Sequence, residues 1–366
     1  MLKKFAVTNF RGFAERIEWD LSSPSNYEFN THVVKNGIIK NGIIFGPNGS
    51  GKSNFSEAIF DLIYHLTQKV KHRNHYENFV YGADEKLLVL FEYTFQFEKN
   101  IVQYNYAKNA RGILIEETLI VNNETIFSRK SNKLEINSEH FIINNETKQG
   151  LKRNENNISI INYLLLSYPL IKGHYLIQLY AFVNSMLWFR SLRQNEFMGL
   201  ENTGGLISEF IIKNNLVNDF SIFLLSISGQ KFKFEKPKPT DKTLFCKMSG
   251  KSMEFLTISS TGTSALMTVY YWIKKMDKAS FVFIDEFDAF YHYKLAYEVC
   301  DRLFKLNCQV FTSSHNTYLM NNNLLRPDCN FILQNNKIKA LQDCTDKELR
   351  FGHNIEKLFR GGAFEL

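Results

Sequence analysis

Gly-Pro-Asn-Gly-Ser-Gly-Lys-Ser, at residues 46–53, fits the pattern G-x-x-x-x-G-K-[ST] at every fixed position. The apolar run at residues 42–45 predicts a buried strand before it, and the residues from Asn54 onward predict a helix. Glycines let the chain turn so that successive backbone N–H groups point at one anion, and the start of a helix adds its positive end at the same place. The sequence therefore predicts a phosphate-binding loop.

Two residues of this loop have roles of their own. Lys52 is expected to reach the β- and γ-phosphates of a nucleoside triphosphate, and the Ser53 hydroxyl is expected to ligate Mg²⁺. The residues predicted to contact the nucleotide here are Asn48, Gly49, Ser50, Gly51, Lys52, Ser53 and Asn54. A glycine-rich turn that binds no ligand is the alternative, and the strand before it and the helix after it argue against that alternative.

The composition is that of a globular protein. The chain has 366 residues, a length that allows one large or two ordinary domains. Of these residues, 44% are hydrophobic and 14% are aromatic, as in a folded protein with a sizeable core. The net charge of +7, from 44 basic and 37 acidic residues, is mild for this length. It permits contact with nucleic acid or other anions but does not require it.

The cysteines and the apolar segments indicate a protein of the reduced cytoplasm without a membrane segment. None of the five cysteines belongs to a C-x-x-C pair or to a metal-ligand spacing. The N-terminus turns polar too soon for the core of a signal peptide. The longest apolar window, residues 160–189, is interrupted by Lys172, His174 and Gln178, so buried helices are expected there rather than a bilayer span.

The start of the chain predicts two strands joined by a turn. Residues 2–8 and 15–20 alternate apolar and polar positions on either side of a glycine-containing turn that carries Arg11. Arg11 would face the nucleotide phosphates if the second strand brings the turn beside the phosphate-binding loop. A solvated surface arginine is an equally good interpretation.

The middle of the chain changes its hydrophobic period twice. After the loop, apolar residues at helical spacing predict a helix that continues to about residue 70. A period of about two at residues 87–143 predicts an antiparallel meander, and residues 159–228 read as several helices. The expected parts are an N-terminal part with the loop and the meander at 1–150, a helical insertion with a basic loop at 151–250, and a C-terminal part at 251–366.

Residues 231–242 are rich in lysine. They interleave five lysines with two phenylalanines and two prolines. This composition is compatible with nucleic-acid binding. A solvated sheet edge followed by a loop explains it equally well, because lysine and proline protect exposed edges.

A second carboxylate-bearing stretch completes the predicted nucleotide site. Residues 281–288 form an apolar strand that ends in Asp285 and Glu286. An aspartate at such a strand end holds the Mg²⁺ shell in phosphate-loop ATPases, which is the role expected of Asp285. Glu286 is then placed to polarise a water for attack on the γ-phosphorus. A surface cluster of two acids is the weaker alternative, because two charges beside an apolar strand need a counter-ion.

Two further stretches bear on the same site. Residues 258–263 form a Gly/Ser/Thr cluster that opens an apolar helix and is suited to bind an anion. It would crowd the phosphate-binding loop if it served the same phosphates, so it is expected to serve the nucleotide of another subunit. Downstream, the strand predicted at residues 308–312 leads to His315, which could contact a γ-phosphate.

The order of these elements resembles a known group of proteins. Phosphate loop, S-x-G-T helix start, apolar strand with Asp-Glu, and strand-end histidine are similar to the ATP-binding-cassette heads of SMC/RecN and OLD-type ATPases. Asn-Phe-Arg-Gly-Phe at residues 9–13 and Ser-His-Asn-Thr-Tyr-Leu-Met from residue 314 resemble, more narrowly, compact bacterial AAA_15/AAA_21-type ATPases, often found in anti-phage systems. The resemblance covers residues 1–75 and 250–360.

The resemblance implies a role for each matching residue. The implied roles are Lys52 and Ser53 for phosphate and Mg²⁺, Asp285 for Mg²⁺, Glu286 for hydrolysis, His315 as γ-phosphate switch, Ser260 and Gly262 as the signature that closes on a partner's ATP, Asp288 in the loop that communicates across the dimer, and Arg11 near phosphate. Two departures stand out. Thr261 replaces the first glycine of the signature, and no glutamine-loop residue can be placed, since Gln96 and Gln103 are poor candidates.

The expected fold is an α/β ABC-ATPase head: a mixed sheet with the phosphate loop, an antiparallel β arm and an inserted helical subdomain, without a long coiled coil. The implied cofactors are ATP and Mg²⁺. The implied function is an ATPase that forms a homodimer or higher homo-oligomer through shared ATP sites, and whose nucleotide-driven dimerisation controls a separately encoded effector in bacterial anti-phage defence. The alternative is a DNA-binding repair ATPase of the SMC/RecN kind. A transporter subunit is a third reading, disfavoured by the N-terminal turn and the meander.

Overall fold

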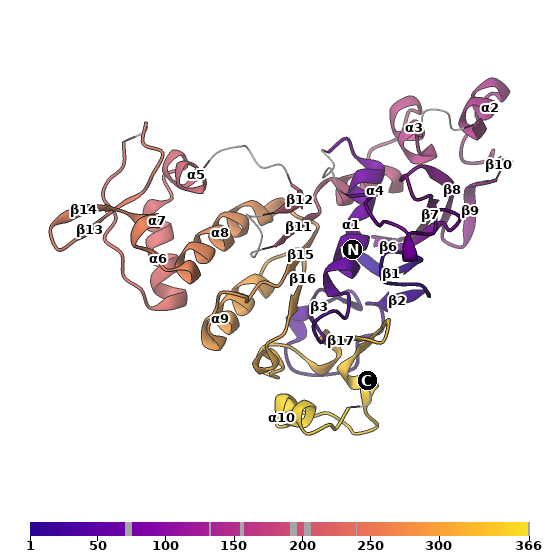
Figure 1. The fold of residues 1–366 in the computed structure, drawn as a ribbon. Coiled ribbons are helices and arrows are strands. Elements are labelled where there is room, and N and C mark those ends of the chain that lie inside the picture. Colours follow the sequence, from indigo (N-terminus) through magenta and orange to yellow (C-terminus); the bar gives the residue numbers. More distant parts are fainter. Residues whose placement is uncertain are drawn as a thin grey trace.

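The computed structural model describes residues 1–69, 75–131, 133–153, 157–190, 196–200, 206–238 and 240–364. Two seven-stranded sheets form the body, with helix α1 (Lys52–Leu66) between them (Figure 1). The arm sheet has the order β10-β9-β8-β7-β6-β1-β2, and the core sheet has the order β12-β11-β15-β16-β5-β17-β18.

The strands of the arm sheet are β1 (Leu2–Thr8), β2 (Ile17–Asp20), β6 (Val89–Phe97), β7 (Asn100–Lys108), β8 (Leu114–Val121), β9 (Glu124–Lys130) and β10 (Lys133–Ile136). Those of the core sheet are β5 (Asn41–Phe45), β11 (Leu187–Arg190), β12 (Phe197–Gly199), β15 (Phe281–Asp285), β16 (Gln309–Ser314), β17 (Asn330–Gln334) and β18 (Lys337–Ala340). Two small hairpins are β3 (Val34–Lys35) with β4 (Ile38–Ile39), and β13 (Phe245–Met248) with β14 (Lys251–Glu254).

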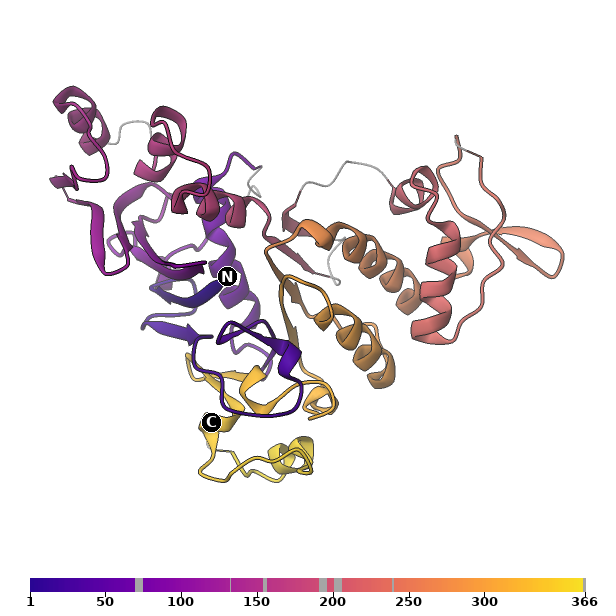
Figure 2. The ribbon, with the colours of Figure 1, turned by 180° about the vertical axis from the view of Figure 1, so that it is seen from behind.

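The remaining helices are α2 (Asn145–Arg153), α3 (Ile160–Ser167), α4 (Tyr175–Asn184), α5 (Ile207–Lys213), α6 (Val217–Ser228), α7 (Phe255–Ile258), α8 (Thr261–Lys275), α9 (Tyr293–Phe304) and α10 (Ile355–Arg360). Helices α8 and α9 lie on the side of the core sheet away from α1 (Figure 2). Beyond them projects an outer lobe, which we define as residues 206–238 and 240–258; it holds α5, α6, α7 and the β13–β14 hairpin.

Hydrophobic pattern explains the two kinds of sheet. Alternate residues of β6 are fully buried, as expected for a strand of a sheet with one covered face. Every residue of β15 is buried, as expected for a parallel strand covered on both faces. The predicted N-terminal strands, antiparallel meander and strands before Gly46, at Asp285 and before His315 are confirmed.

Helix α1 forms the core between the sheets through its aromatic residues. The Phe55 ring lies 5.6 Å from that of Phe5 and 5.7 Å from that of Trp19, both in the arm sheet. On the other side, the Phe60 ring lies 5.8 Å from that of Phe281 in the core sheet. Burial of such rings is a large hydrophobic contribution, so α1 is fixed against both sheets at once.

Two expectations were wrong. The helix after the loop ends at Leu66 rather than near residue 70, because Thr67 turns extended and both its backbone N–H and its hydroxyl bond to the carbonyl of Ile63. The segment 159–228 was expected to be helical, yet it contributes β11 and β12 to the core sheet, and Trp188 lies in β11. A run of four apolar residues cannot be told from a buried helical turn by periodicity.

The described part of the chain contains no single helix that is long and apolar enough to cross a bilayer. The bent pair α5 and α6 passes such a test of length and composition when its two helices are joined across their 120° bend. Within the same residues there is also no long coiled-coil arm, as expected, since the longest helices have 15 residues.

A buried charge cluster ties the second half of α1 to the arm sheet. Asp61 is fully buried, and its Oδ2 accepts hydrogen bonds from Lys108 Nζ and Tyr106 OH, both at 2.7 Å. Its Oδ1 lies 3.0 Å from His75 Nε2. Burial by itself would raise the pKa of Asp61, but the Lys108 charge and the His75 contact hold that pKa below its ordinary value.

Lys108→Met is expected to lower the free energy of unfolding by about 3–5 kcal/mol at pH 7, because it leaves a buried carboxylate without its cation. In the variant, burial without the cation raises the pKa of Asp61, so the carboxyl takes up a proton as pH falls and the uncompensated buried charge disappears. The difference between wild type and variant should therefore shrink in acid. Urea denaturation at pH 7 and pH 4 measures both effects. Lys133→Met, which removes an exposed pair with Glu135, should change little.

Candidate functional site

Four strands of the core sheet end at one edge. β11, β15, β16 and β5 are parallel neighbours, with Arg190 opposite Asp285 and Ser314 opposite Phe45 in the register. The carboxyl ends of parallel strands meet at the same side of a sheet, which is where such sheets bind ligands. The loop after Phe45 and the residues after Asp285 and Ser314 therefore lie side by side, although the loop is far from the other two in the sequence.

The phosphate-binding loop depends on glycine at two positions. Gly51 has φ +94°, and a Cβ there would lie 2.8 Å from the Phe13 ring. A Cβ on Gly46 would lie 2.4 Å from the carbonyl oxygen of Leu333. No other residue fits either position without a shift of its neighbours. The loop is thus packed tightly from behind and opens toward the strand edge at the start of α1.

Lys52 lies across this loop. Its Nζ donates to the carbonyl oxygens of Gly46 at 2.8 Å and Pro47 at 3.1 Å, and the residue is only 6% exposed. Burial lowers the pKa of Lys52, while the charges of Asp285 and Glu286 act in the opposite direction. The ammonium group is therefore held by the loop carbonyls and shielded from solvent.

The end of β15 is fixed by its neighbour β16. Asp285 is fully buried, and its Oδ1 accepts a hydrogen bond from Ser313 Oγ at 2.6 Å. The same hydroxyl accepts the backbone N–H of Glu286 at 2.8 Å. Glu286 has φ +49°, a left-handed conformation that is uncommon for a non-glycine residue and clusters at functional sites. This turn directs Glu286 out of the strand, where it is partly exposed.

His315 and Asp288 lie at the same edge. His315 is exposed, but partial desolvation of its ring and the nearby Lys52 charge lower its pKa, and the charges of Glu286, Asp288 and Asp285 partly oppose this shift. The imidazole is therefore neutral at pH 7 and can donate or accept a hydrogen bond. Asp288 Oδ2 accepts the Ser314 hydroxyl at 2.7 Å, and burial raises the pKa of Asp288. Strand β16 thus positions both groups.

Arg11 lies beside the first turn of α1. Its Nη1 is 2.6 Å from Glu57 Oε2 and 3.3 Å from Asn54 Oδ1, and its side chain is 19% exposed. It is therefore held in an ion pair next to the loop rather than in solvent. Arg11 therefore lies beside the phosphate-binding loop. Its contact with a phosphate stays a prediction.

The predicted signature lies on a different element. Ser260 caps α8: its Oγ accepts the backbone N–H of Thr263 at 3.2 Å. A Cβ on Gly262 would lie 3.0 Å from the carbonyl oxygen of Phe290. α8 begins beside α7, the last helix of the outer lobe, and away from the start of α1 (Figure 1). Among the described residues, no hydrogen bond or ion pair joins Ser260 or Gly262 to the loop of the same chain.

Sequence reasoning missed Arg190. This residue ends β11, and its Nε and Nη2 donate to Asp285 Oδ2 at 2.9 and 2.7 Å. The sequence contains a weak signal for it, because the short apolar run at residues 187–189 ends in this basic residue. Only the pairing of β11 with β15 shows that the arginine contacts Asp285. The two weak candidates for a glutamine-loop residue, Gln96 and Gln103, lie on β6 and β7 of the other sheet.

The donors at this edge suit Mg²⁺ only together with a phosphate ligand. Among the described residues no group of three or more His, Cys, Asp or Glu gathers as a metal site. The Ser53 hydroxyl and the Asp285 carboxylate are the predicted donors. Mg²⁺ in nucleotide sites uses one or two carboxylates and takes its other ligands from phosphates and water, so the residues present fit the ion.

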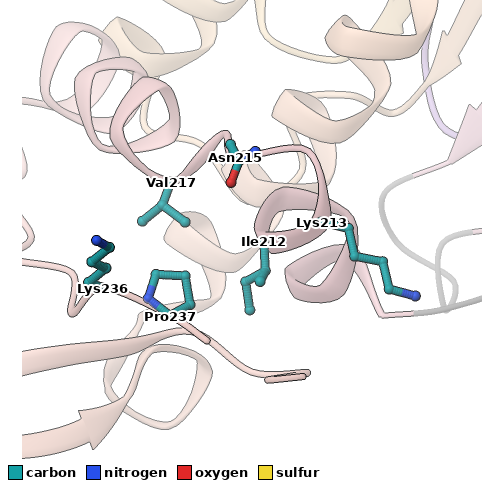
Figure 3. Close-up of a pocket in the computed structure, with 6 residues that line it drawn as sticks. All are labelled: Ile212, Lys213, Asn215, Val217, Lys236 and Pro237. Carbon is teal, nitrogen blue, oxygen red and sulfur yellow. The ribbon is translucent and has the colours of Figure 1, made fainter. Parts of the chain in front are cut away.

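A separate cavity of about 390 Å³ lies in the outer lobe, between the α5–α6 turn and the extended segment at 236–237. Figure 3 shows the residues that line it: Ile212, Lys213, Asn215, Val217, Lys236 and Pro237. It shares no residue with the strand edge, so it is not part of the site described above.

Comparisons with known proteins bear on these observations. A family model, AAA_21, described as “AAA domain, putative AbiEii toxin, Type IV TA system”, matches residues 43–321. No curated protein matches the chain.

Three solved structures are similar to the chain. The SMC head domain from Thermotoga maritima is 16% identical, with a TM-score of 0.45 over 92% of this chain and 97% of that chain. An SmcHead bound to the C-winged helix domain of ScpA is 15% identical, with a TM-score of 0.48 over 93% of this chain and 97% of that one. An Smc head with an extended coiled coil, bound to the C-terminal domain of ScpA derived from Pyrococcus furiosus, is 12% identical, with a TM-score of 0.45 over 92% and 95%.

Proposed function

The chain belongs to the AAA_21 family, and from this we propose that it binds ATP with Mg²⁺ and hydrolyses it at the strand edge described above. The observation that carries the proposal is that the loop after β5, the two carboxylates at the end of β15 and the histidine after β16 lie at one edge of paired parallel strands. These groups are the ones that phosphoryl transfer needs for charge neutralisation and for orienting the attacking water.

Each residue has a role in this mechanism. Backbone N–H groups of residues 48–53 bind the phosphate oxygens, and Lys52 shifts from the loop carbonyls to the β- and γ-phosphates. Glu286, turned out of β15, accepts a hydrogen bond from the attacking water and takes its proton. Neutral His315 donates a hydrogen bond to the γ-phosphate. A bound Mg²⁺ would neutralise phosphate charge and would be held by Ser53 and Asp285.

We also propose that a second copy of the chain completes each site. In support, the α8 start caps itself with Ser260 and lies apart from the loop of its own chain. The start of a 15-residue helix with small residues is suited to bind an anion. Ser260 and Gly262 would therefore approach the γ-phosphate held by the partner, with Asp288 near the same seam. Hydrolysis then reopens the pair.

One experiment tests the binding and assembly parts together. Purified chain is titrated with ATP and Mg²⁺ by calorimetry, its mass is measured by light scattering with and without ATP, and phosphate release is followed. Binding, a doubling of mass with ATP and steady phosphate release are expected. A chain that binds no ATP would refute the function, and a chain that binds ATP as a persistent monomer would refute the shared site.

For the cellular role we propose that nucleotide state controls a separately encoded effector in anti-phage defence, in the cytoplasm. The family description names a toxin of a toxin–antitoxin system, which supports a defence setting. All five cysteines are buried and unpaired, which agrees with a reducing compartment. Affinity purification with the neighbouring gene product tests this proposal: recovery of a toxin-like or nuclease chain in an ATP-dependent complex is the expected result.

A lysine-rich surface supports a second candidate function, binding of DNA. Residues 233–235 pair with β13, since Lys247 N donates to the Lys233 carbonyl at 2.9 Å and Glu235 N to the Phe245 carbonyl at 2.8 Å. This pairing sets exposed Lys233 opposite exposed Lys247. Like charges opposite each other across strands are unfavourable, and neither lysine is in an ion pair with a described residue. A phosphate backbone would relieve this repulsion.

If DNA binds there, the double variant Lys233→Ser/Lys247→Ser should bind duplex DNA more weakly at every sequence. The slope of log affinity against log salt should fall by about two, one for each lost phosphate contact. Fluorescence anisotropy at several salt concentrations measures this. Lys337→Ser/Lys339→Ser, a matched exposed pair on β18, serves as control. If the wild type and both double variants bind DNA with equal affinity, this lysine-rich surface does not bind DNA.

A further inference from the structure

Arg190 and Asp285 form a buried ion pair at the predicted metal site. They lie opposite each other in the parallel pairing of β11 with β15. Two guanidinium N–H groups of Arg190, Nε and Nη2, donate to the same carboxylate oxygen, Oδ2, at 2.9 and 2.7 Å. Asp285 is 0% exposed and Arg190 is 8% exposed. Such a fork holds both the charge and the orientation of the carboxylate.

The pair belongs to a longer row of alternating charges. Arg190 Nη2 is 3.6 Å from Glu57 Oε1, and the other oxygen of Glu57 is 2.6 Å from Arg11 Nη1. The row Arg11, Glu57, Arg190 and Asp285 thus contains two cations and two anions, and it runs from the N-terminal turn along α1 to the end of β15. Glu196 lies 3.8 Å from Arg190 Nη1 at its margin. The negative charge of Asp285 is thus compensated by the Arg190 guanidinium.

The hydrogen bonds leave Asp285 little capacity for a metal. A carboxylate oxygen has two lone-pair sites. Both sites on Oδ2 are taken by Arg190, and one site on Oδ1 is taken by the Ser313 hydroxyl. The one remaining site lies next to a fixed guanidinium, so a divalent cation arriving alone meets a neutral ion pair and the repulsion of Arg190. Phosphate oxygens would supply the missing negative charge.

We propose that Arg190 is the resident counter-ion of Asp285 and that it makes metal binding at this carboxylate conditional on a bound nucleotide. Arg190 is a positioning residue in this account, since it acts through Asp285 and not on the phosphates. The inference rests on the proposed function in that Asp285 faces the nucleotide. The inference predicts how the nucleotide-free protein binds a metal ion. Its test can therefore fail even if the protein binds ATP, and can succeed even if it does not.

The test uses Mn²⁺ as the probe, with free Mn²⁺ counted by electron paramagnetic resonance in the absence of nucleotide. Wild-type protein should bind no Mn²⁺ at this site at micromolar concentrations. Arg190→Met should bind one Mn²⁺ at least about tenfold more tightly than wild type, because its buried carboxylate has lost its cation. Arg190→Met/Asp285→Asn should lose that binding again, and Arg190→Lys, which keeps the charge, should stay close to wild type.

Thermal melting gives a second readout. Mg²⁺ alone should raise the melting temperature of Arg190→Met and leave that of wild type unchanged, whereas a purely structural arginine would give the same loss of stability with and without Mg²⁺. Arg16→Met, which removes an arginine paired with Glu18 and Glu92 on the arm sheet, is the matched control and should bind no Mn²⁺. If the Arg190→Met variant does not fold, Mn²⁺ binding to the wild-type protein still tests the proposal. One tight Mn²⁺ site in the nucleotide-free wild type overturns the proposal, and its absence until ADP is added supports it.

Discussion

Glu286→Gln is expected to reduce ATP turnover by about 10²–10⁴-fold while leaving ATP binding intact, because the amide keeps the shape of the side chain but cannot take a proton from water. Glu286 is suited to this role by its backbone: it leaves the end of β15 in a left-handed turn held by the Ser313 hydroxyl. The ATP-bound pair should then persist. Phosphate release and light scattering in the presence of ATP measure the two effects.

The control for this variant is Glu298→Gln, an exposed glutamate on α9 that lies outside the site. It should hydrolyse ATP at the wild-type rate. Unchanged turnover in Glu286→Gln would show that another group activates the water. Slow turnover without a stable ATP-bound pair would keep the hydrolytic role of Glu286 and reject the cycle in which hydrolysis reopens the dimer.

Lys52→Met is expected to weaken ATP binding by about 10²–10⁴-fold, since hydrogen bonds to charged groups contribute about 1.5–3 kcal/mol each and Lys52 reaches two phosphates. In the structure the ammonium donates to two loop carbonyls, so it already lies within the loop. Methionine keeps the length of the side chain without its charge. Calorimetric titration with ATP and with ADP measures the loss, which should be larger for ATP.

Lys35→Met, an exposed lysine on β3, provides the comparison and should bind ATP normally. Thermal melting of both variants separates lost binding from a disturbed loop, because Lys52 also satisfies the carbonyls of Gly46 and Pro47. ATP binding at wild-type affinity in a folded Lys52→Met protein would contradict the assignment of residues 46–53 as the nucleotide loop.

The parts of the fold that could be predicted are those with a strict local pattern. The phosphate-binding loop, the apolar strand ending at Asp285 and the alternation of the meander each follow from spacing within about ten residues. Their meeting at one edge could be expected from the rule that ligands lie at the carboxyl ends of parallel strands. Serines 313 and 314 could not be expected, because their roles depend on pairing β15 with β16.

The missed elements have physical reasons of their own. β11 has only four residues, all buried, so neither its length nor its period distinguishes it from the helices around it. Its neighbour in the sheet lies about ninety residues further along the chain, and no local signal encodes that pairing. Helix α1 ends at Leu66 because Thr67 is extended and directs both its backbone N–H and its hydroxyl to the Ile63 carbonyl, although the apolar spacing in the sequence continues beyond it.

Helix α1 begins in the loop, packs its aromatic rings on both sheets and carries Asp61, which is salt-bridged to the arm sheet, in its second half. Helix α1 is thus fixed against both sheets at once. A nucleotide bound at its first turn, as proposed above, is therefore expected to move α1 and the arm sheet together rather than the loop alone.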